Sequence, residues 1–363
     1  MTSTLKEKIR QNKLFSALIT KTIFNIQRIL PQIIAILLAF LTGAIILLAT
    51  GYAPLEAYSA MLIGAFGNLT SIGLTFSNAT PILFTALAFL FAFKSGLFNI
   101  GAEGQLLIGG FAAALVGISF NDLPSFIHVP LALLAAALAG GLWGLIPAVL
   151  KVWFGAHEVI TTMMLSYVAL YFTSYLVNYP YKAPGWVSQT IPVSPSAELP
   201  RLLQASQLSA AIILAMLLVV LTWYIFQKTS FGYEIRAIGL SVSVAENAGI
   251  NVKRGMIYAL IISGAIAGIG GAGEVLGVHR RFIDGFSPGY GWDGLAVALV
   301  GGLHPVGVLV AAILFGALRS GGMTMSRVVG VPIDIIFLIQ ALVILYVAAP
   351  ELIRFILKRG RLK

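Results

Sequence analysis

The sequence has no cysteine, only four histidines, and charged side chains at only 10% of its 363 positions. Without cysteine there can be no disulfide bonds, no thiol catalysis and no cysteine-ligated metal sites. The scarcity of charge excludes an ordinary soluble domain, whose surface needs a larger charged fraction. Apolar residues make up 59% of the chain, which is typical of a protein embedded in a lipid bilayer.

Sequence signatures of catalysis and of ATP binding are also missing. No serine–histidine–acid arrangement or carboxylate pair stands out, and His157 has no second histidine at helical spacing. We therefore expect neither an enzyme active site nor a metal site. No G-x-x-x-x-G-K-[ST] phosphate loop occurs, and the match of 268–273 to the dinucleotide fingerprint lies inside an apolar helix. Gly264, Gly268 and Ala272 instead form a small-residue stripe that favours close packing of membrane helices.

Long apolar runs recur along the chain, and most are close to the 20 residues that cross a bilayer as a helix. A membrane β-barrel would show short alternating segments instead. We therefore predict an all-α, polytopic transmembrane bundle of about 8–10 spans, with one or more broken or re-entrant helices. The expected spans are 31–50, 80–94, 97–119, 129–154, 158–178, 208–227, 255–278 and 333–349, with an ambiguous segment at 55–78 and two short pieces within 292–320.

The net charge of +10 is concentrated before the first span, in the loop 228–254 and after the last span. Lys and Arg gather in the cytoplasmic loops of membrane proteins. We interpret residues 1–30 as a cytoplasmic N-terminal segment, 31–349 as the transmembrane domain and 350–363 as a cytoplasmic tail. Anionic lipid headgroups are a sufficient partner for this charge, so no nucleic acid is expected.

The segment 94–105 combines three glycines with Asn99, Glu103 and Gln105 at the edge of an apolar run. Polar groups and irregular backbone inside a bilayer usually line a cavity or face a partner. A helix cap at the cytoplasmic edge would explain Glu103 equally well. Glu103-Gly104 followed by Gly109-Gly110 weakly resembles Asp293-Gly294 followed by Gly301-Gly302, and interrupted segments at corresponding places in two halves favour a transport site.

The loop 228–254 has features of a docking element. The pattern predicts a short helix over 241–248 that ends at Gly249, and a connection with its own helix is more typical of docking than of tethering. An ordinary cytoplasmic connection is the alternative. His157-Glu158-Val159-Ile160-Thr161-Thr162 lies between two spans, where a carboxylate in the first helical turn complements the helix dipole.

Together these stretches resemble, from about residue 30 to 350, the permeases of the ATP-binding cassette (ABC) importers for branched-chain amino acids, ribose and nucleosides. The resemblance is closest to the nucleoside and simple-sugar branch, which works with a lipoprotein-type binding protein. It is carried by Gly96–Gly101 with Glu103–Gln105, by Glu158–Thr162, by Tyr233–Gly239 through Ala248–Ile250, and by Gly289–Gly294 through Gly301-Gly302. Two positions depart from the family pattern: Ser241–Ser243 replaces a stretch that usually contains Asn-Pro, and His157 stands where such sequences often have Asn. The second departure leaves the identity of the substrate undetermined.

The resemblance implies a permease subunit in the cytoplasmic membrane with both termini in the cytoplasm. Its expected partners are a second, different permease, a cytoplasmic ABC ATPase that hydrolyses the ATP, and an extracytoplasmic substrate-binding lipoprotein. This chain itself is expected to bind no cofactor. Nucleosides are the expected substrate; alternatives are simple sugars or branched-chain amino acids, or an ion-coupled secondary transporter, which would not need the loop 233–250.

Three groups of candidate site residues follow. The substrate pathway is predicted to include Phe98, Asn99, Glu103, Gln105, Glu158, Thr161, Thr162, Trp292 and Asp293. The ATPase is predicted to dock on Tyr233, Glu234, Arg236, Ala237, Gly239, Ala245, Glu246 and Gly249. The predicted topology places Arg280 and Arg281 in a loop on the external side of the membrane, against the positive-inside bias. We expect one or both of them to bind carboxylates of the binding protein. The alternative is that Asp284 pairs with one of them.

Overall fold

The computed structural model describes residues 32–120 and 122–348, which fall into two compact units. One unit contains a helix over Gln32–Ala49 together with α13, Ile333–Ala348. Within it, the hydroxyls of Thr42 and Tyr346 are 3.0 Å apart and hydrogen-bonded. The predicted basic segments 1–30 and 350–363 lie outside the described residues.

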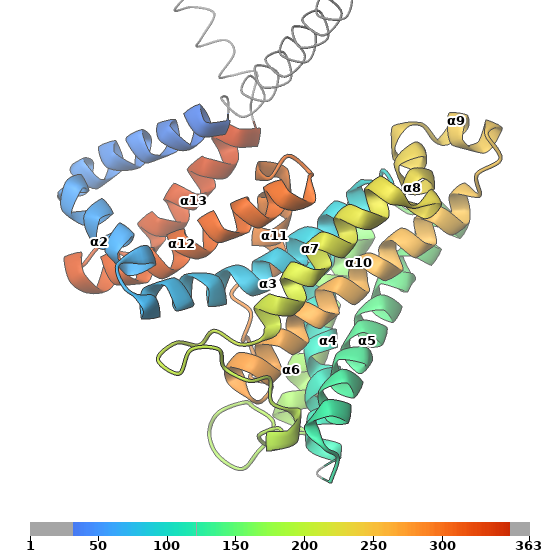
Figure 1. Ribbon diagram of the computed structural model, residues 1–363, viewed down its shortest axis with the longest axis horizontal. Coiled ribbons are helices and arrows are strands. Elements are labelled where there is room, and N and C mark those ends of the chain that lie inside the picture. Colours follow the sequence, from blue (N-terminus) through green and yellow to red (C-terminus); the bar gives the residue numbers. More distant parts are fainter. Residues whose placement is uncertain (1–31, 121, 349–363) are drawn as a thin grey trace, which may run out of the picture. The chain divides into compact units, whose positions relative to one another are not determined.

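The second unit, Leu55–Val331, carries the features that the sequence singled out. Its helices, labelled in Figure 1, are α2 (Pro54–Phe66), α3 (Leu69–Phe93), α4 (Ala102–Ser119), α5 (Ser125–Phe154), α6 (Glu158–Asn178), α7 (Ala211–Lys228), α8 (Ser230–Leu240), α9 (Val242–Asn247), α10 (Val252–Glu274), α11 (Tyr290–Val300) and α12 (Pro305–Val329). A 3₁₀ turn, η1 (Pro195–Ala197), and a π-helical turn, η2 (Val275–His279), complete it.

The predicted all-α, polytopic architecture is confirmed, since eight of the described helices are long and apolar enough to cross a membrane. The boundaries differ from the prediction at three places. A single helix, α3, runs through Pro81, so the expected short span at 80–94 is the second half of a longer one. A membrane helix tolerates such a proline when the helices packed around it satisfy the backbone groups that the proline leaves without partners. Of the two expected pieces within 292–320, only α11 is short, and α4 begins at Ala102 because turns occupy 95–101.

The glycine stripe of α10 lets three helices approach backbone to backbone. A Cβ atom on Gly264 would overlap the carbonyl oxygen of Gly140 in α5, and one on Gly268 would overlap that of Ala136. On the neighbouring face, a Cβ on Gly271 would overlap the carbonyl oxygen of Leu106 in α4. The close packing predicted for this stripe is therefore confirmed at Gly264 and Gly268.

The two ends of α10 lie in different surroundings. At its start, Val252 packs with Ile238 of α8 and Ala245 of α9. At its other end, the amide of Leu199 in the long 179–210 connection donates to the carbonyl oxygen of Leu276 at 3.1 Å. The α8–α9 pair and this connection thus lie at opposite ends of α10 (Figure 1). In the predicted topology, these ends are the cytoplasmic and the external end.

Candidate functional site

Two interrupted segments, far apart in sequence, meet at the first turns of α4 and α11. The backbone amide of Gly291 donates a hydrogen bond of 2.6 Å to Oε2 of Glu103. Glu103 is only 9% exposed, although it carries a carboxylate. A Cβ on Gly291 would overlap the backbone of Glu103, so only glycine permits this approach. One carboxylate thus lies at the amino ends of two helices, where the helix dipoles stabilise negative charge.

A buried ion pair lies beside this junction. Nη1 of Arg319 in α12 is 3.2 Å from Oδ2 of Asp293 in α11, and the arginine side chain is 7% exposed. The guanidinium carbon lies 4.9 Å from the centre of the Tyr290 ring, which adds a cation–π contact. The sequence analysis did not single out Arg319, although it is the only charged residue in the apolar run 305–326, and such a residue is a signal of a functional site.

Glu274 adds a further buried carboxylate near Arg319. It closes α10 and is 4% exposed, and its Oε2 lies 3.7 Å from Nε2 of His279 in the π-helical turn that follows. Tyr290 interacts electrostatically with Glu103, Asp293, Glu274 and Arg319 together. The junction therefore gathers three acidic side chains and one arginine from four helices, which is an arrangement suited to binding or gating a polar solute.

Asn99 and Gln105 form a separate, fully enclosed network. Nδ2 of Asn99 donates to Oε1 of Gln105 at 2.9 Å and to the hydroxyl of Ser263 at 2.8 Å. Ser263 in turn donates to the carbonyl oxygen of Ala88 at 2.6 Å. Both amide side chains are 1% exposed. This network links α3, α4 and α10, and each amide group is satisfied by protein.

Phe98 and Glu158 have contacts of their own, whereas Trp292 lies in the first turn of α11, at the junction. Phe98 packs edge-on against Phe89, with ring centres 5.0 Å apart. Trp292, on α11, is 40% exposed. Oε2 of Glu158 is 2.7 Å from Nζ of Lys151.

The two threonines at the start of α6 bond mainly to their own helix. The hydroxyl of Thr162 donates to the carbonyl of Glu158 at 2.7 Å and accepts from the amide of Ile100 at 3.2 Å. Thr161 bonds to the carbonyl of Glu158 at 3.2 Å. Thr162 therefore holds the start of α6 against the turn that precedes α4.

The coupling-loop candidates occupy a helical hairpin, α8 and α9. Ser241 caps α9, its hydroxyl accepting from the amide of Val244, and Gly249 follows the helix with a left-handed φ of +80°. The predicted short helix is thus confirmed. Ala245 is buried, Arg236 and Ala237 are half-buried, and the other candidates in this loop are exposed to different degrees. Tyr233 is 62% exposed, and two apolar residues of the same hairpin, Leu240 and Val244, are 88% and 66% exposed.

Gly239 connects this hairpin to the turn before α4. A Cβ on Gly239 would overlap the carbonyl oxygen of Lys94 and lie 3.0 Å from the amide nitrogen of Gly96. The turns and irregular backbone over 94–101 contain Asn99 and lead to Glu103 in the first turn of α4. Direct backbone contact therefore links α8 to the segment that carries both side chains.

The two candidate docking arginines differ in their surroundings. Nε of Arg280 is 3.0 Å from Oε2 of Glu198. Asp284, the expected alternative partner, instead accepts hydrogen bonds from Ser174 and Asn178. No ion-pair partner of Arg281 is found among the described residues.

A helical unit with interrupted segments meeting at buried charges is the architecture of a membrane permease. The family model for the permease component of branched-chain amino acid transport systems matches residues 71–348. The chain belongs to this family, whose members are transport components, and it is a multi-pass membrane protein.

Three curated relatives are similar to this chain over two thirds or more of its length. The guanosine ABC transporter permease protein NupP of Bacillus subtilis is 42% identical, covering 93% of this chain and 98% of its own length. The glucose ABC transporter permease protein TsgB13 of Haloferax volcanii is 33% identical over 88% of this chain and 87% of its own. A second guanosine permease of Bacillus subtilis, NupQ, is 32% identical over 68% of this chain and 79% of its own. No solved structure gave a significant match.

Proposed function

We propose that this chain is one of two permease subunits of an ATP-driven nucleoside importer in the cytoplasmic membrane, with both termini in the cytoplasm. The junction of α4 and α11 carries the proposal. There, Glu103, Asp293 and Arg319 are held by two interrupted membrane segments, and such segments surround the substrate sites of transporters. Glu103, Asp293 and the exposed Trp292 would then face the substrate pathway, while Asn99 and Gln105 brace it.

Nucleosides are supported as the substrate class by the similarity to NupP, which extends over nearly the whole of both chains. A nucleoside offers hydroxyls and an aromatic ring face, which suit polar groups beside aromatic side chains. The similarity to TsgB13 keeps a simple sugar as the second candidate.

The partner subunits follow from the same comparison. NupP and NupQ are named for the same substrate in one organism, which supports a second permease that differs from this chain. Because the sequence has no phosphate loop, ATP is hydrolysed by a separate ATPase, which docks on the α8–α9 hairpin. A binding protein delivers the substrate from outside.

The test uses the complex of both permeases, the ATPase and the binding protein in proteoliposomes. We expect guanosine and uridine, but not glucose or leucine, to stimulate ATP hydrolysis and to enter the vesicles. Stimulation by glucose alone would replace the nucleoside assignment with the sugar one. Stimulation by leucine alone would place the chain with the amino acid importers.

A further inference from the structure

A stripe of four tyrosines runs along the exposed side of α6. Tyr167, Tyr171, Tyr175 and Tyr179 follow one another at intervals of four residues, and they are 43%, 70%, 57% and 71% exposed. Residues four apart lie on the same face of a helix. The stripe covers about 18 Å along the helix axis, at 1.5 Å per residue.

The stripe differs from the exposed side of the neighbouring helix α5. There the outward-facing residues in the middle of the helix are Leu131, Leu134, Leu138 and Leu142, with exposures of 36% to 63%. Leucine suits contact with lipid chains, whereas an unpaired hydroxyl in hydrocarbon is costly. Tyrosines that anchor a helix at the membrane–water interface lie at the depth of the lipid headgroups. This stripe instead extends from the middle of α6 to its end. Met164, Val168 and Phe172 are also exposed on α6, so this helix offers hydroxyls and ring faces among apolar side chains, a surface that suits a solute with both polar groups and an aromatic ring.

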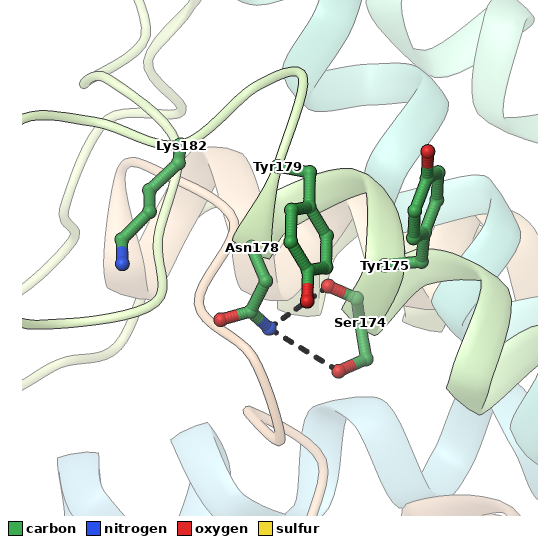
Figure 2. Close-up of a pocket in the computed structure, with 5 residues that line it drawn as sticks. All are labelled: Ser174, Tyr175, Asn178, Tyr179 and Lys182. Carbon is green, nitrogen blue, oxygen red and sulfur yellow. Dashed lines mark hydrogen bonds between the residues drawn. The ribbon is translucent and has the colours of Figure 1, made fainter.

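The stripe ends in a pocket near the carboxyl end of α6. The pocket has a volume of ≈ 360 Å³ and is lined by Ser174, Tyr175, Asn178, Tyr179 and Lys182. Figure 2 shows the two tyrosine rings on one side and the side chain of Lys182 on the other. The ring centres are 5.1 Å apart, with an angle of 34° between the ring planes. Ligand pockets for small molecules begin at about 300 Å³.

The floor of this pocket is built by hydrogen bonds within the protein. Nδ2 of Asn178 donates to Oδ2 of Asp284 at 3.0 Å, and Oδ1 of Asn178 accepts from the hydroxyl of Ser188 at 2.5 Å. The hydroxyl of Ser174 donates to the same carboxylate oxygen at 2.8 Å. These bonds tie α6 to the loops at 188 and 284. The groups left to face a ligand are the rings and hydroxyls of Tyr175 and Tyr179 and the ammonium of Lys182.

We propose that this pocket is the entry site for the nucleoside, an inference that rests on the proposed nucleoside import. The base lies against the rings of Tyr175 and Tyr179, because aromatic faces stack on any base. The ribose hydroxyls accept hydrogen bonds from Lys182 and from the tyrosine hydroxyls. From there, Tyr171 and Tyr167 offer further ring faces toward the middle of the membrane.

The experiment measures the initial rate of ATP-driven uptake of labelled guanosine by the complete transporter in proteoliposomes. Removing both rings, by Tyr175→Leu with Tyr179→Leu, should lower this rate about tenfold, the effect of losing a stacking contact worth about 1.4 kcal/mol. The pair Tyr175→Phe with Tyr179→Phe keeps the rings and should retain more of the rate. Tyr224→Leu is the matched control, because Tyr224 lies on α7 and is 53% exposed; it should transport normally.

Photolabelling with 8-azidoguanosine provides a second readout that does not depend on transport. Labelled peptides should come from residues 175–182. If the leucine pair transports like the wild type, or the label maps elsewhere, the entry site is wrong while nucleoside import stands. Loss of the second permease from the purified leucine variant would also overturn it, since the stripe would then be a subunit contact. A wild-type transporter that takes up glucose and no nucleoside would overturn both.

Discussion

The carboxylate of Glu103 accepts a 2.6 Å hydrogen bond from the amide of Gly291, a residue 188 positions further along the chain. This bond joins the amino end of α4 to the amino end of α11. Both helices begin after interrupted segments, and the amides of a helix's first turn need partners from outside the regular helical pattern. A single buried acid at their meeting point holds the two segments together.

Replacing Glu103 with Ala should destabilise the transporter and strongly reduce uptake. It removes a charged acceptor from a buried amide, a loss of about 1.5–3 kcal/mol. Glu103→Gln keeps an acceptor oxygen and should lose less stability. Thermal unfolding of the purified complex measures the difference. Glu56→Gln serves as control, since Glu56 is an exposed acid in the first turn of α2. Equal effects of Glu103→Ala and the control would show that the bond has no structural role.

The Arg319–Asp293 pair should behave as a buried, coupled ion pair. Removing either partner alone leaves the other charge buried and should cost about 3–5 kcal/mol. Removing both should cost less than the sum, with a coupling of about 0.5–3 kcal/mol in a double-mutant cycle. The Lys151–Glu158 pair, at 2.7 Å but with a lysine 29% exposed, provides the comparison and should couple by about 0–1 kcal/mol. Additive effects at Arg319 and Asp293 would contradict the proposed pairing.

Gly239→Val should uncouple ATP hydrolysis from transport. The valine side chain would displace the backbone at Lys94 and Gly96 and so disturb the contact through which α8 moves the turn before α4. We expect continued hydrolysis with greatly reduced uptake, or loss of the ATPase during purification. Glu234→Gln is the comparison variant, because Glu234 is an exposed residue of α8 that is not part of this contact. It tests binding of the ATPase without changing the contact with the turn before α4. Normal uptake per ATP hydrolysed in Gly239→Val would rule out the transmission route.

Arg281→Ala should weaken docking of the binding protein modestly. An exposed ion pair contributes about 1 kcal/mol or less, so the half-saturating concentration of binding protein should rise by at most about fivefold. The maximal uptake rate should be unchanged, and the effect should shrink at high salt. Arg280→Ala is the companion variant, because Arg280 already pairs with Glu198. An unchanged saturation curve for both variants would show that neither arginine takes part.

The membrane architecture was predictable from the sequence because long apolar runs alone indicate transmembrane helices. The continuity of α3 through Pro81 was not, since it depends on the neighbouring helices that bury it. The helix over 241–248 was predictable from local capping residues. These features involve only nearby positions in the chain.

The partners of the buried polar residues were less predictable. The polarity of Glu103 and Asp293 was visible, but the contact with Gly291 forms only when α4 and α11 meet. Arg319 had a signal of its own that was overlooked, because it is the only charged residue in the apolar run 305–326. The salt bridge of Arg280 with Glu198, rather than with Asp284, depends on the path of the 179–210 connection, for which the sequence pattern holds no information.

The central claim is tested most directly by measuring whether ATP hydrolysis or an ion gradient drives uptake. Uptake of labelled guanosine is measured in proteoliposomes that contain either this chain alone or the complete complex with its binding protein. Our account predicts uptake only by the complete complex with ATP accessible to the ATPase, and none by the isolated chain under a sodium or proton gradient. Gradient-driven accumulation of guanosine by the isolated chain would contradict the account and identify a secondary transporter.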